Sequence, residues 1–429
     1  MNTVKTTEIG CYEGKRVQLQ GWLHTTRQIG GISFVILRDG FGTVQAVFEG
    51  ESAPFPQPES VIRLTGLVVA SQQAPGGMEI IQPELETLAA VNETLPVTMG
   101  KKELTASLPT LLDHAVVLNR HPSRRAVFKL AAGTMAAFRQ TLSERDFTEV
   151  QSPKLVGSST EGGSNVFELP YFERKAWLAQ SPQFYKQIMV GVFERVFEVG
   201  PVFRAEAHDT SRHINEYVSL DVEFGFIENH FTVMALVRDL MSGIFTSLEE
   251  RFSNELEILG AKVPIVPAEI PHIHFEKALE LITAETGENV IGEMDLSPQN
   301  ERFLGQWAQE THGSDFLFVV GYPMAKRPFY THPDPSNQVW SNSFDLLFRG
   351  TELITGGQRR HLYADYLNAL AQAGMPTEPF EHYLEAFKFG MPPHGGFAIG
   401  MERLIMQLCG LPNVKLATLF PRDMKRLVP

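Results

Sequence analysis

The N-terminal part of the chain contains a series of short strand-like runs separated by glycine-rich turns, and this series constrains the fold more than any other feature. Each run is a few residues long, and several alternate between apolar and polar positions. The runs span residues 17–23, 34–40, 44–48, 61–69 and 78–81. About five short strands of this kind predict a small barrel or sandwich. An oligonucleotide-binding barrel is one such solution, and the pattern alone does not separate it from a small β-sandwich.

The rest of the chain mixes helix-like and strand-like segments without a repeating order. Residues 92–120 contain Pro96, Pro109 and few periodic positions, so they predict a linker. Apolar residues at helical spacing predict a helix over 123–145, and strand-like runs then alternate irregularly with helices such as 232–252. Because strands and helices do not alternate strictly, an α+β domain with an antiparallel sheet is favoured over a Rossmann-type domain.

Length and composition limit the classes of protein to which the chain can belong. Its 429 residues suffice for two or three domains. Cys11 and Cys409 are too few and too far apart for a disulfide framework or a zinc site, which predicts a reducing cytoplasm. The N-terminus lacks a signal-peptide pattern, and the apolar runs 281–283 and 317–320 are too short to cross a membrane. The net charge of −13 argues against a protein that coats DNA or RNA non-specifically, but leaves selective RNA binding open.

Two arginines that are far apart in the sequence are the strongest candidates for a functional site. Arg204 follows Val202 and Phe203, and Arg403 ends the glycine-rich segment 395–403. An unpaired guanidinium would be costly to bury in such surroundings. Arginine offers a planar fork of donors that suits phosphate and carboxylate. Two of them in one pocket would suit a nucleotide triphosphate and the anion that attacks it.

Charged segments accompany these arginines. Residues 203–216 predict a hairpin whose loop carries two arginines, two histidines and three acids, although surface ion pairs would also explain them. Residues 345–360 include Glu352 and Thr355, whose oxygens suit a hard cation such as Mg²⁺, but an ordinary charged turn is an equal alternative. Residues 395–403 predict a strand, a turn and a helix, without the spacing of the common nucleotide-binding loops.

Taken together, these segments resemble the class II aminoacyl-tRNA synthetases, and the aspartyl enzymes of the short archaeal type most closely. Pro153 is similar to the first class signature, residues 203–206 to the second and residues 400–403 to the third. The step Ser181-Pro182-Gln183 and the loop 160–163 are similar to the aspartyl branch and unlike the asparaginyl branch. The likeness covers nearly the whole chain.

The resemblance implies an α+β fold with three parts. Residues 1–93 would form a five-stranded OB-fold barrel that binds the anticodon, 94–120 a linker or hinge, and 121–429 a class II catalytic domain with an antiparallel sheet. The implied activity is ATP-dependent activation of L-aspartate to aspartyl-adenylate, followed by transfer to the 3′ end of tRNA(Asp). The implied protein is a cytoplasmic homodimer that binds neither a membrane nor DNA.

The resemblance also assigns roles to residues, with ATP as a substrate and Mg²⁺ as the metal. It implies that Arg204 and Arg403 are catalytic. The residues implied to bind aspartate are Glu161, Gln183, Phe184, Tyr185, Lys186, Arg204, Thr355 and Arg359. Those implied to bind ATP are Arg204, Ala205, Glu206, Arg212, His213, Ile214, Glu352, Gly400, Met401, Glu402 and Arg403. Glu352 and Thr355 are implied to bind Mg²⁺, and Arg27, Phe34 and Gln45 to meet the anticodon, where an aromatic ring can stack on a base. A core position in a small barrel is an alternative for Phe34.

Specificity depends on a few positions. Lys186 and Arg359 are predicted to reject asparagine, because its amide would leave two buried cations unpaired. His24 and Pro75 resemble the residues of relaxed relatives rather than the tryptophan and lysine of those that accept only tRNA(Asp). They therefore predict that tRNA(Asn) is also charged and that a tRNA-dependent amidotransferase completes the product.

Three alternatives stay open at the level of sequence. The closest is an asparaginyl-tRNA synthetase. An amide ligase of the same fold generally lacks the barrel that residues 16–88 predict. An inactive RNA-binding paralogue is disfavoured by the intact Arg204, Arg403 and Glu352.

Overall fold

The computed structural model describes residues 3–50, 54–157 and 165–429. The chain divides into two compact units, with the boundary between Ser123 and Arg124. Two short helices, α1 (Leu108–Asp113) and α2 (Ala115–Leu118), form near the end of the first unit. Residues 94–120 are therefore partly helical.

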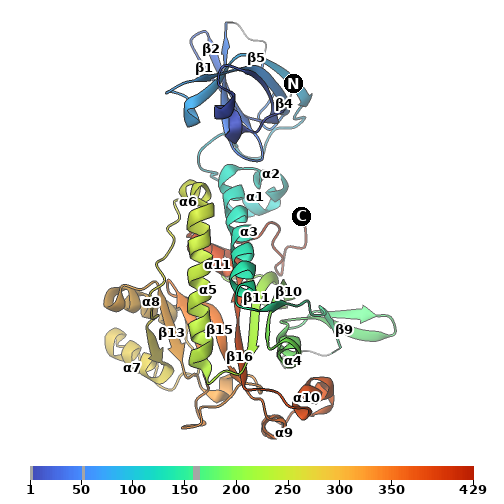
Figure 1. Ribbon diagram of the computed structural model, residues 1–429, viewed down its shortest axis with the longest axis vertical. Coiled ribbons are helices and arrows are strands. Elements are labelled where there is room, and N and C mark those ends of the chain that lie inside the picture. Colours follow the sequence, from blue (N-terminus) through green and yellow to red (C-terminus); the bar gives the residue numbers. More distant parts are fainter. Residues whose placement is uncertain (1–2, 51–53, 158–164) are drawn as a thin grey trace. The chain divides into compact units, whose positions relative to one another are not determined.

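The first unit is built on five strands, as the sequence pattern predicts (Figure 1). They are β1 (Arg16–Ile29), β2 (Ile32–Arg38), β3 (Thr43–Glu49), β4 (Val61–Ala70) and β5 (Met78–Ala89). The strands close on themselves in the order β1-β2-β3-β5-β4. Alternation along β2 sends Val35 and Leu37 into the barrel core, while Phe34 and Ile36 are only partly buried. The barrel thus has its own apolar core.

The second unit is built on an eight-stranded sheet in the order β12-β13-β14-β15-β16-β11-β10-β6. The strands are β6 (Thr148–Glu149), β10 (Arg195–Phe203), β11 (Glu216–Gly225), β12 (His272–His274), β13 (Phe316–Val320), β14 (Ser343–Phe348), β15 (Thr351–Arg359) and β16 (His394–Gly400). A separate small sheet contains β7 (Leu155–Val156), β8 (Glu168–Tyr171) and β9 (Arg174–Leu178).

The prediction of an antiparallel sheet is correct for the central strands and wrong at both edges. Strand β12 pairs parallel to β13, and β6 pairs parallel to β10. Parallel neighbours need a long crossover instead of a hairpin. The two helices α7 (Phe275–Thr286) and α8 (Pro298–His312) supply that crossover between β12 and β13. The sheet is therefore mixed.

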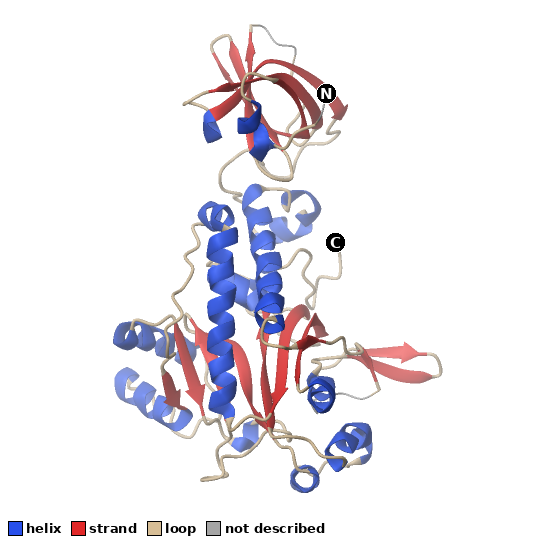
Figure 2. Ribbon diagram, in the orientation of Figure 1, coloured by secondary structure: helices blue, strands red, loops and turns tan. Residues whose placement is uncertain are grey.

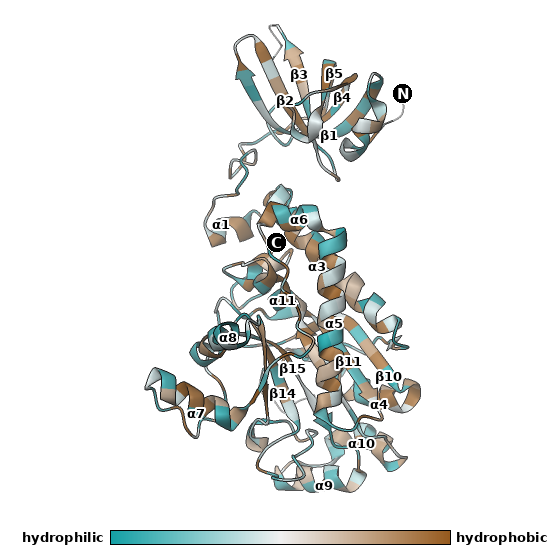
Figure 3. Cartoon of the chain, turned by 60° about the vertical axis from the view of Figure 1, so that its left-hand side comes forward, coloured by the Kyte–Doolittle hydropathy of each residue, from teal (hydrophilic) through white to brown (hydrophobic). Residues whose placement is uncertain are grey.

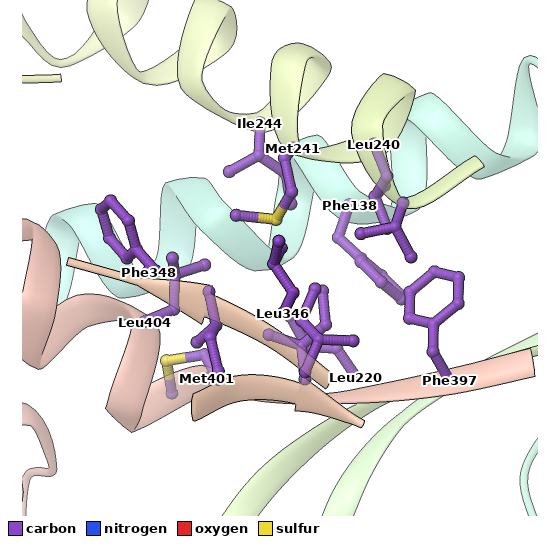
Figure 4. Packing of buried hydrophobic residues seen from close by; sticks show 14 of the residues in the cluster. Phe138, Leu220, Leu240, Met241, Ile244, Leu346, Phe348, Phe397, Met401 and Leu404 are labelled. Atoms are coloured by element: carbon purple, nitrogen blue, oxygen red, sulfur yellow. The ribbon is translucent and has the colours of Figure 1, made fainter. Parts of the chain in front are cut away.

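Two long helices, α3 (Pro122–Ser143) and α5 (His230–Arg251), lie side by side across one face of the sheet (Figures 1 and 2). Phe138 of α3 and Met241 of α5 point toward Leu220 and Phe397 of the sheet (Figure 4). The remaining helices are α4 (Gln183–Phe193), α6 (Ser253–Leu259), α9 (Tyr363–Gln372), α10 (Glu381–Lys388) and α11 (Met401–Leu408). The apolar core between helices and sheet leaves the opposite sheet face for polar side chains.

Helix α5 is the one helix of the described residues that is long and apolar enough to cross a membrane by length and composition. It is much longer than the apolar runs 281–283 and 317–320. Its apolar residues include Val233, Val237 and Ile244, which are fully buried in the main core. Apolar and polar residues alternate along it (Figure 3). This pattern is that of a helix packed on a sheet.

Two local predictions that matter for the site are confirmed. Strands β10 and β11 form the predicted antiparallel hairpin, with Phe203 opposite Glu216. Strand β16 leads directly into α11, so that the helix begins at Met401 immediately after Gly400. The two predicted arginines thereby follow strands that are separated by one strand only, since β11 lies between β10 and β16 in the sheet.

Candidate active site

A cavity of about 450 Å³ lies on the sheet face that α3 and α5 leave open. Side chains alternate between the two faces of β11: Ser219 and Asp221 line the cavity, whereas Leu220 and Val222 belong to the core. The predicted site residues that line it are Gln183, Lys186, Arg204, Glu206, Arg212, His213, Ile214, Glu352, Thr355, Arg359, Gly400, Glu402 and Arg403. Segments separated by more than two hundred residues are thus gathered at one place.

Several predicted residues are not part of the cavity lining. They are Phe184, Tyr185, Ala205 and Met401. Phe184 is a core residue that stacks on Tyr383, with ring centroids 4.3 Å apart. Met401 is likewise buried in the main core, where it fixes the start of α11. Glu161 lies outside the described residues.

Arg204 is held by its main chain and leaves its guanidinium accessible. Its N–H donates to the carbonyl of Asn215 at 2.8 Å, and the Asn215 amide donates to the Arg204 carbonyl at 2.7 Å. The side chain is 41% exposed, with Nη1 3.9 Å from Glu206 Oε1 and the guanidinium 5.8 Å from the centre of the Tyr217 ring. The charge therefore lies at the cavity rather than in the apolar core, which removes the burial cost that the sequence suggested.

Arg403 reaches the cavity from the first turn of α11. Its Nη1 donates to the carbonyl of Glu352 at 2.8 Å and lies 3.4 Å from the Glu352 carboxylate. Burial raises the pKa of Glu352, but the guanidiniums of Arg403 and Arg327 outweigh it and lower the pKa overall. Glu352 is therefore ionised at neutral pH, and Arg403 links α11 to β15.

Glu352, Thr355 and Asp345 form an oxygen-rich patch next to Arg403. The Thr355 hydroxyl donates to Glu352 Oε1 at 3.2 Å, and Asp345 of β14 is the cross-strand partner of Thr355. Burial raises the pKa of Asp345 to about 6, with Arg327 opposing and the Glu352 charge adding to the rise. Two carboxylates that repel each other beside a hydroxyl fit a divalent cation whose other ligands are phosphate oxygens.

No cluster of three or more His, Cys, Asp or Glu side chains able to hold a metal occurs in the described ranges. Sequence reasoning did not assign Asp345. The available signal was a single acid among the apolar residues of the fully buried strand β14.

The basic side chains assigned to aspartate selection already have carboxylate partners, which corrects the sequence argument. Lys186 Nζ donates to Asp221 Oδ1 at 2.9 Å and to the Phe397 carbonyl at 3.1 Å. Arg359 Nε donates to Glu223 Oε1 at 3.0 Å. Both cations are almost fully buried, and two formal positive charges face two negative ones. An asparagine side chain would therefore not leave them unpaired.

Asp221 and Glu223 are further residues that the sequence reasoning left without a role. Both lie on β11, where the structure pairs them with the cations Lys186 and Arg359. Burial raises the pKa of Glu223, but Arg359 and Lys186 lower it overall. The result is a neutral quartet of Lys186, Asp221, Glu223 and Arg359.

Glu402 lines the cavity but is bound to the main chain. Both of its carboxylate oxygens accept from the Val218 N–H, at 3.1 Å each, so the side chain ties α11 to β11. Burial raises the pKa of Glu402 from 4.5 to about 7, with the hydrogen bond opposing. Glu402 therefore has a structural role beside the ATP-binding role that the resemblance implies.

The three residues predicted to meet the anticodon share one outward face of the barrel. Arg27 of β1 is directly opposite Phe34 of β2, and Gln45 of β3 pairs with Ile36 on the same side. Arg27 is exposed, whereas Phe34 and Gln45 are partly buried. An accessible aromatic ring between a guanidinium and an amide is an arrangement that can bind an unstacked base.

The two positions predicted to set tRNA discrimination differ in environment. Pro75 is exposed in the short 3₁₀ helix η2 (Pro75–Gly77). His24 is only 9% exposed and lies where the β1–β2 register shifts. Its Nδ1 is 3.4 Å from Arg38 Nη1, and Arg38 in turn forms a buried ion pair with Glu59. Burial lowers the pKa of His24 to about 4, so the ring is neutral at neutral pH.

Comparison with known families agrees with this geometry. The family model of tRNA synthetases class II (D, K and N) matches residues 107–424, and that of an OB-fold nucleic acid binding domain matches residues 17–88. The second match identifies the barrel as an OB-fold, which the strand pattern alone did not separate from a small β-sandwich. The first match covers both hairpin arginines and the β16–α11 segment.

Individual relatives are similar over nearly their whole length. The chain is 47% identical to an aspartate–tRNA(Asp/Asn) ligase of Thermus thermophilus, covering 99% of this chain and 100% of the relative. It is also 47% identical to the enzyme of the same name from Deinococcus radiodurans, with 99% and 98% covered. Among solved structures, asparaginyl-tRNA synthetase from Pyrococcus horikoshii, complexed with asparaginyl-adenylate, matches with a TM-score of 0.93 at 31% identity, covering 100% of both chains. With its signature arginines in one cavity and a family match over most of its length, the chain belongs to the class II tRNA synthetases of the D, K and N group.

Proposed function

We propose that this protein is an aspartate–tRNA ligase, which activates L-aspartate with ATP and transfers it to the 3′ end of tRNA(Asp). The observation that carries the proposal is the cavity in which Arg204, Glu352 and Arg403 meet the quartet around Lys186 and Arg359. The 47% identity to the Thermus ligase supports the choice of amino acid. ATP suits the cavity because five arginines line it together with the Glu352 patch.

The activation step needs positioning and charge stabilisation. An oxygen of the aspartate α-carboxylate attacks the α-phosphorus of ATP, a new P–O bond forms, and pyrophosphate leaves with the electrons of the broken bond. Arg204 would contact the α-phosphate and the carboxylate, while Arg403 would lie near the γ-phosphate. Both would stabilise charge that develops in the transition state. The ribose of the tRNA 3′ end then takes the aspartyl group from the adenylate.

Glu352 and Thr355, with Asp345 beside them, would hold Mg²⁺. When bound, the ion supplies positive charge against the phosphates. The chain's own contribution is to place the Glu352 carboxylate, whose pKa Arg403 and Arg327 lower, beside Asp345, whose pKa burial raises to about 6. Phosphates can complete the coordination at this place.

Amino-acid exchange assays test the proposal. The protein is expected to catalyse ATP–pyrophosphate exchange with aspartate and not with asparagine. Exchange with asparagine alone would contradict it in favour of an asparaginyl enzyme, the second candidate, which the structural neighbour with a TM-score of 0.93 favours. Arg204→Ala should abolish exchange and leave tRNA affinity nearly unchanged.

We also propose that tRNA(Asn) is charged with aspartate and that an amidotransferase converts the product. His24 and Pro75 support this, as does the Asp/Asn name of the 47% identical relatives. A relative from Pyrococcus horikoshii at 38% identity is named for tRNA(Asp) alone, so the assay must separate the two. Purified tRNA(Asp) and tRNA(Asn) should both accept labelled aspartate. Failure on tRNA(Asn) would refute this part only.

The cellular location, the assembly and the division into domains are proposed as well. We propose a cytoplasmic homodimer, with an anticodon-binding domain in residues 1–93, a hinge in 94–120 and a catalytic domain in 121–429. Strand β6, which ends the sheet, and the exposed Leu155 and Phe193 support a partner surface. Light scattering after size-exclusion chromatography should give twice the chain mass of 47.9 kDa. A monomer at micromolar concentration would refute the dimer.

A further inference from the structure

Helix α8 lies between the second and third signature segments in the sequence, and none of its residues lines the cavity. Its first turn carries Glu301, which is 5% exposed and does not line the cavity. Ser297 caps the helix by accepting from the Asn300 N–H, and Pro298 is its first residue. A carboxylate in the first turn of a helix is stabilised by the helix dipole. Glu301 is therefore a buried carboxylate behind the cavity wall.

The two oxygens of Glu301 bind two different parts of the site. Oε1 accepts from Arg212 Nη2 at 3.0 Å, and Oε2 accepts from the N–H of Glu352 at 2.8 Å. Arg212 belongs to the loop between β10 and β11, and Glu352 to β15. One buried carboxylate thus joins a phosphate-side arginine to the strand that carries the cation patch.

Glu352 is held through both of its main-chain groups, the N–H and the carbonyl. Its N–H donates to Glu301, and its carbonyl accepts from Arg403 at 2.8 Å. The register between β14 and β15 shifts next to it, between Leu346 and Leu347. A bulge leaves peptide groups outside the regular ladder and lets the strand bend. Side chains from α8 and α11 therefore fix the place where the regular pairing is disturbed.

The packing of α8 makes this arrangement rigid. A Cβ atom added to Gly305 would lie 2.4 Å from the Cα of Gly350, in the turn between β14 and β15. One added to Gly350 would lie 2.9 Å from the Cα of Arg302. The helix backbone thus lies directly on the turn that precedes Glu352. The backbone that carries Glu301 is therefore held close to the turn before Glu352.

We infer that Glu301 is a positioning residue for ATP: it holds the Arg212 guanidinium and the Glu352 main chain in one fixed relation. The inference rests on the proposed function and extends it to a residue that touches neither substrate. Arg212 is oriented toward the cavity instead of sampling many rotamers, and Glu352 is presented together with it. Such orientation lowers the entropic cost of binding the triphosphate.

A competing role predicts the opposite result. If Glu301 merely neutralised Arg212, a triphosphate would have to displace it, and removing the carboxylate would tighten ATP binding. If Glu301 positions Arg212, removing the charge weakens ATP binding. The sign of the change therefore distinguishes the two.

The test compares Glu301→Gln with Glu310→Gln, which removes an exposed acid from the same helix. The measurements are the Kd for a non-hydrolysable ATP analogue with Mg²⁺, by calorimetry, and the KM values for ATP and aspartate in pyrophosphate exchange. Glu301→Gln should weaken analogue binding and raise the KM for ATP about tenfold or more, since a charge-assisted hydrogen bond is lost. The KM for aspartate should stay within about twofold, and Glu310→Gln should match the wild type.

Two further results test whether Glu301 positions Arg212. In an Arg212→Met background, Glu301→Gln should have a smaller effect than in the wild type, because coupled residues are not additive. Unchanged or tighter analogue binding, equal losses for ATP and aspartate, or full additivity would overturn the inference. If Glu301→Gln misfolds, as judged by its melting temperature, Glu301→Asp replaces it and is expected to show the same selective loss for ATP. If the wild type shows no aspartate-dependent exchange, the proposed function is refuted. Binding of the ATP analogue would still test the positioning role of Glu301.

Discussion

Single buried charges decide the chemistry on the sheet face of this protein. Glu223 is fully buried between Lys186 Nζ, 3.5 Å from its Oε2, and Arg359 Nε, 3.0 Å from its Oε1. Taking such charges out of water is expensive, and only the mutual pairing and hydrogen bonds offset the cost. Removing one partner leaves an uncompensated buried charge. The quartet is therefore sensitive to any change in a single member.

We expect Glu223→Gln to destabilise the second unit by about 3–5 kcal/mol, because the substitution leaves Lys186 and Arg359 with one carboxylate between them. Scanning calorimetry should show a lower melting temperature for that unit. The control is Glu216→Gln, which changes an exposed acid at the start of the same strand and should melt like the wild type. Equal melting temperatures for both variants would contradict the buried pairing.

Glu402 gives a prediction for pH. Its pKa is about 7 in the folded protein and 4.5 in its ordinary state, so the folded form holds its proton more tightly. Its stabilising contribution is complete below about pH 4.5 and is lost as the pH rises through about 7. Between pH 5 and 8, the melting temperature of Glu402→Gln should therefore fall less than that of the wild type. A parallel decline in both proteins would show that Glu402 does not titrate in this range.

At the scale of elements, close backbone contacts determine which helix can serve the site. Helix α8 and the β14–β15 turn meet through Gly305 and Gly350, with room for hydrogen atoms only. The apolar cluster around α7 and α8, which includes Leu304, Leu317 and Leu347, holds the helix against the sheet. The site thus depends on a helix outside the signature segments.

Gly305→Ala should push α8 away from the turn, because its new methyl group would meet the Gly350 backbone, which cannot rotate aside. We expect a loss of about 1–3 kcal/mol in stability, typical of overpacking, and a higher KM for ATP. Gln309→Ala, at an exposed position of the same helix, is the matched control and should leave both quantities unchanged. A normal KM for ATP in a destabilised Gly305→Ala would separate the packing of α8 from the function of the site.

At the scale of the whole molecule, the two units have separate apolar cores. Residues such as Val35 and Leu64 form the core of the barrel, and Phe138 and Leu346 belong to that of the second unit. Each unit can therefore carry its own binding function. The cavity for activation belongs to the second unit, and the face of Arg27, Phe34 and Gln45 belongs to the first.

Phe34→Ala should raise the KM for tRNA about tenfold, since stacking of an aromatic ring on a base contributes about 1–3 kcal/mol. Pyrophosphate exchange, which needs no tRNA, should proceed at the wild-type rate. Leu88→Ala removes an exposed apolar side chain from β5 and serves as the control. If Phe34→Ala charges tRNA normally, Phe34 is a packing residue of the barrel and not a base-binding one.

Local patterns predicted much of the architecture. Alternation identified the five barrel strands and the β10–β11 hairpin, because these depend on neighbours in the sequence. The glycine-rich step at Gly400 indicated where β16 becomes α11. The parallel edge strands β6 and β12 were not predictable in this way, since their pairing depends on crossovers whose direction no local pattern encodes.

The sequence by itself determined which charged residues are present and in which order they follow, and this order was enough to indicate the family. Only the tertiary structure decided their partners: Lys186 with Asp221, Arg359 with Glu223, and Arg212 and Glu352 with Glu301. These contacts join residues that are 35 to 136 positions apart. Whether a buried cation can bind a substrate or is already paired with a carboxylate depends on which strands lie next to each other. Strand order is set by the packing of the whole core.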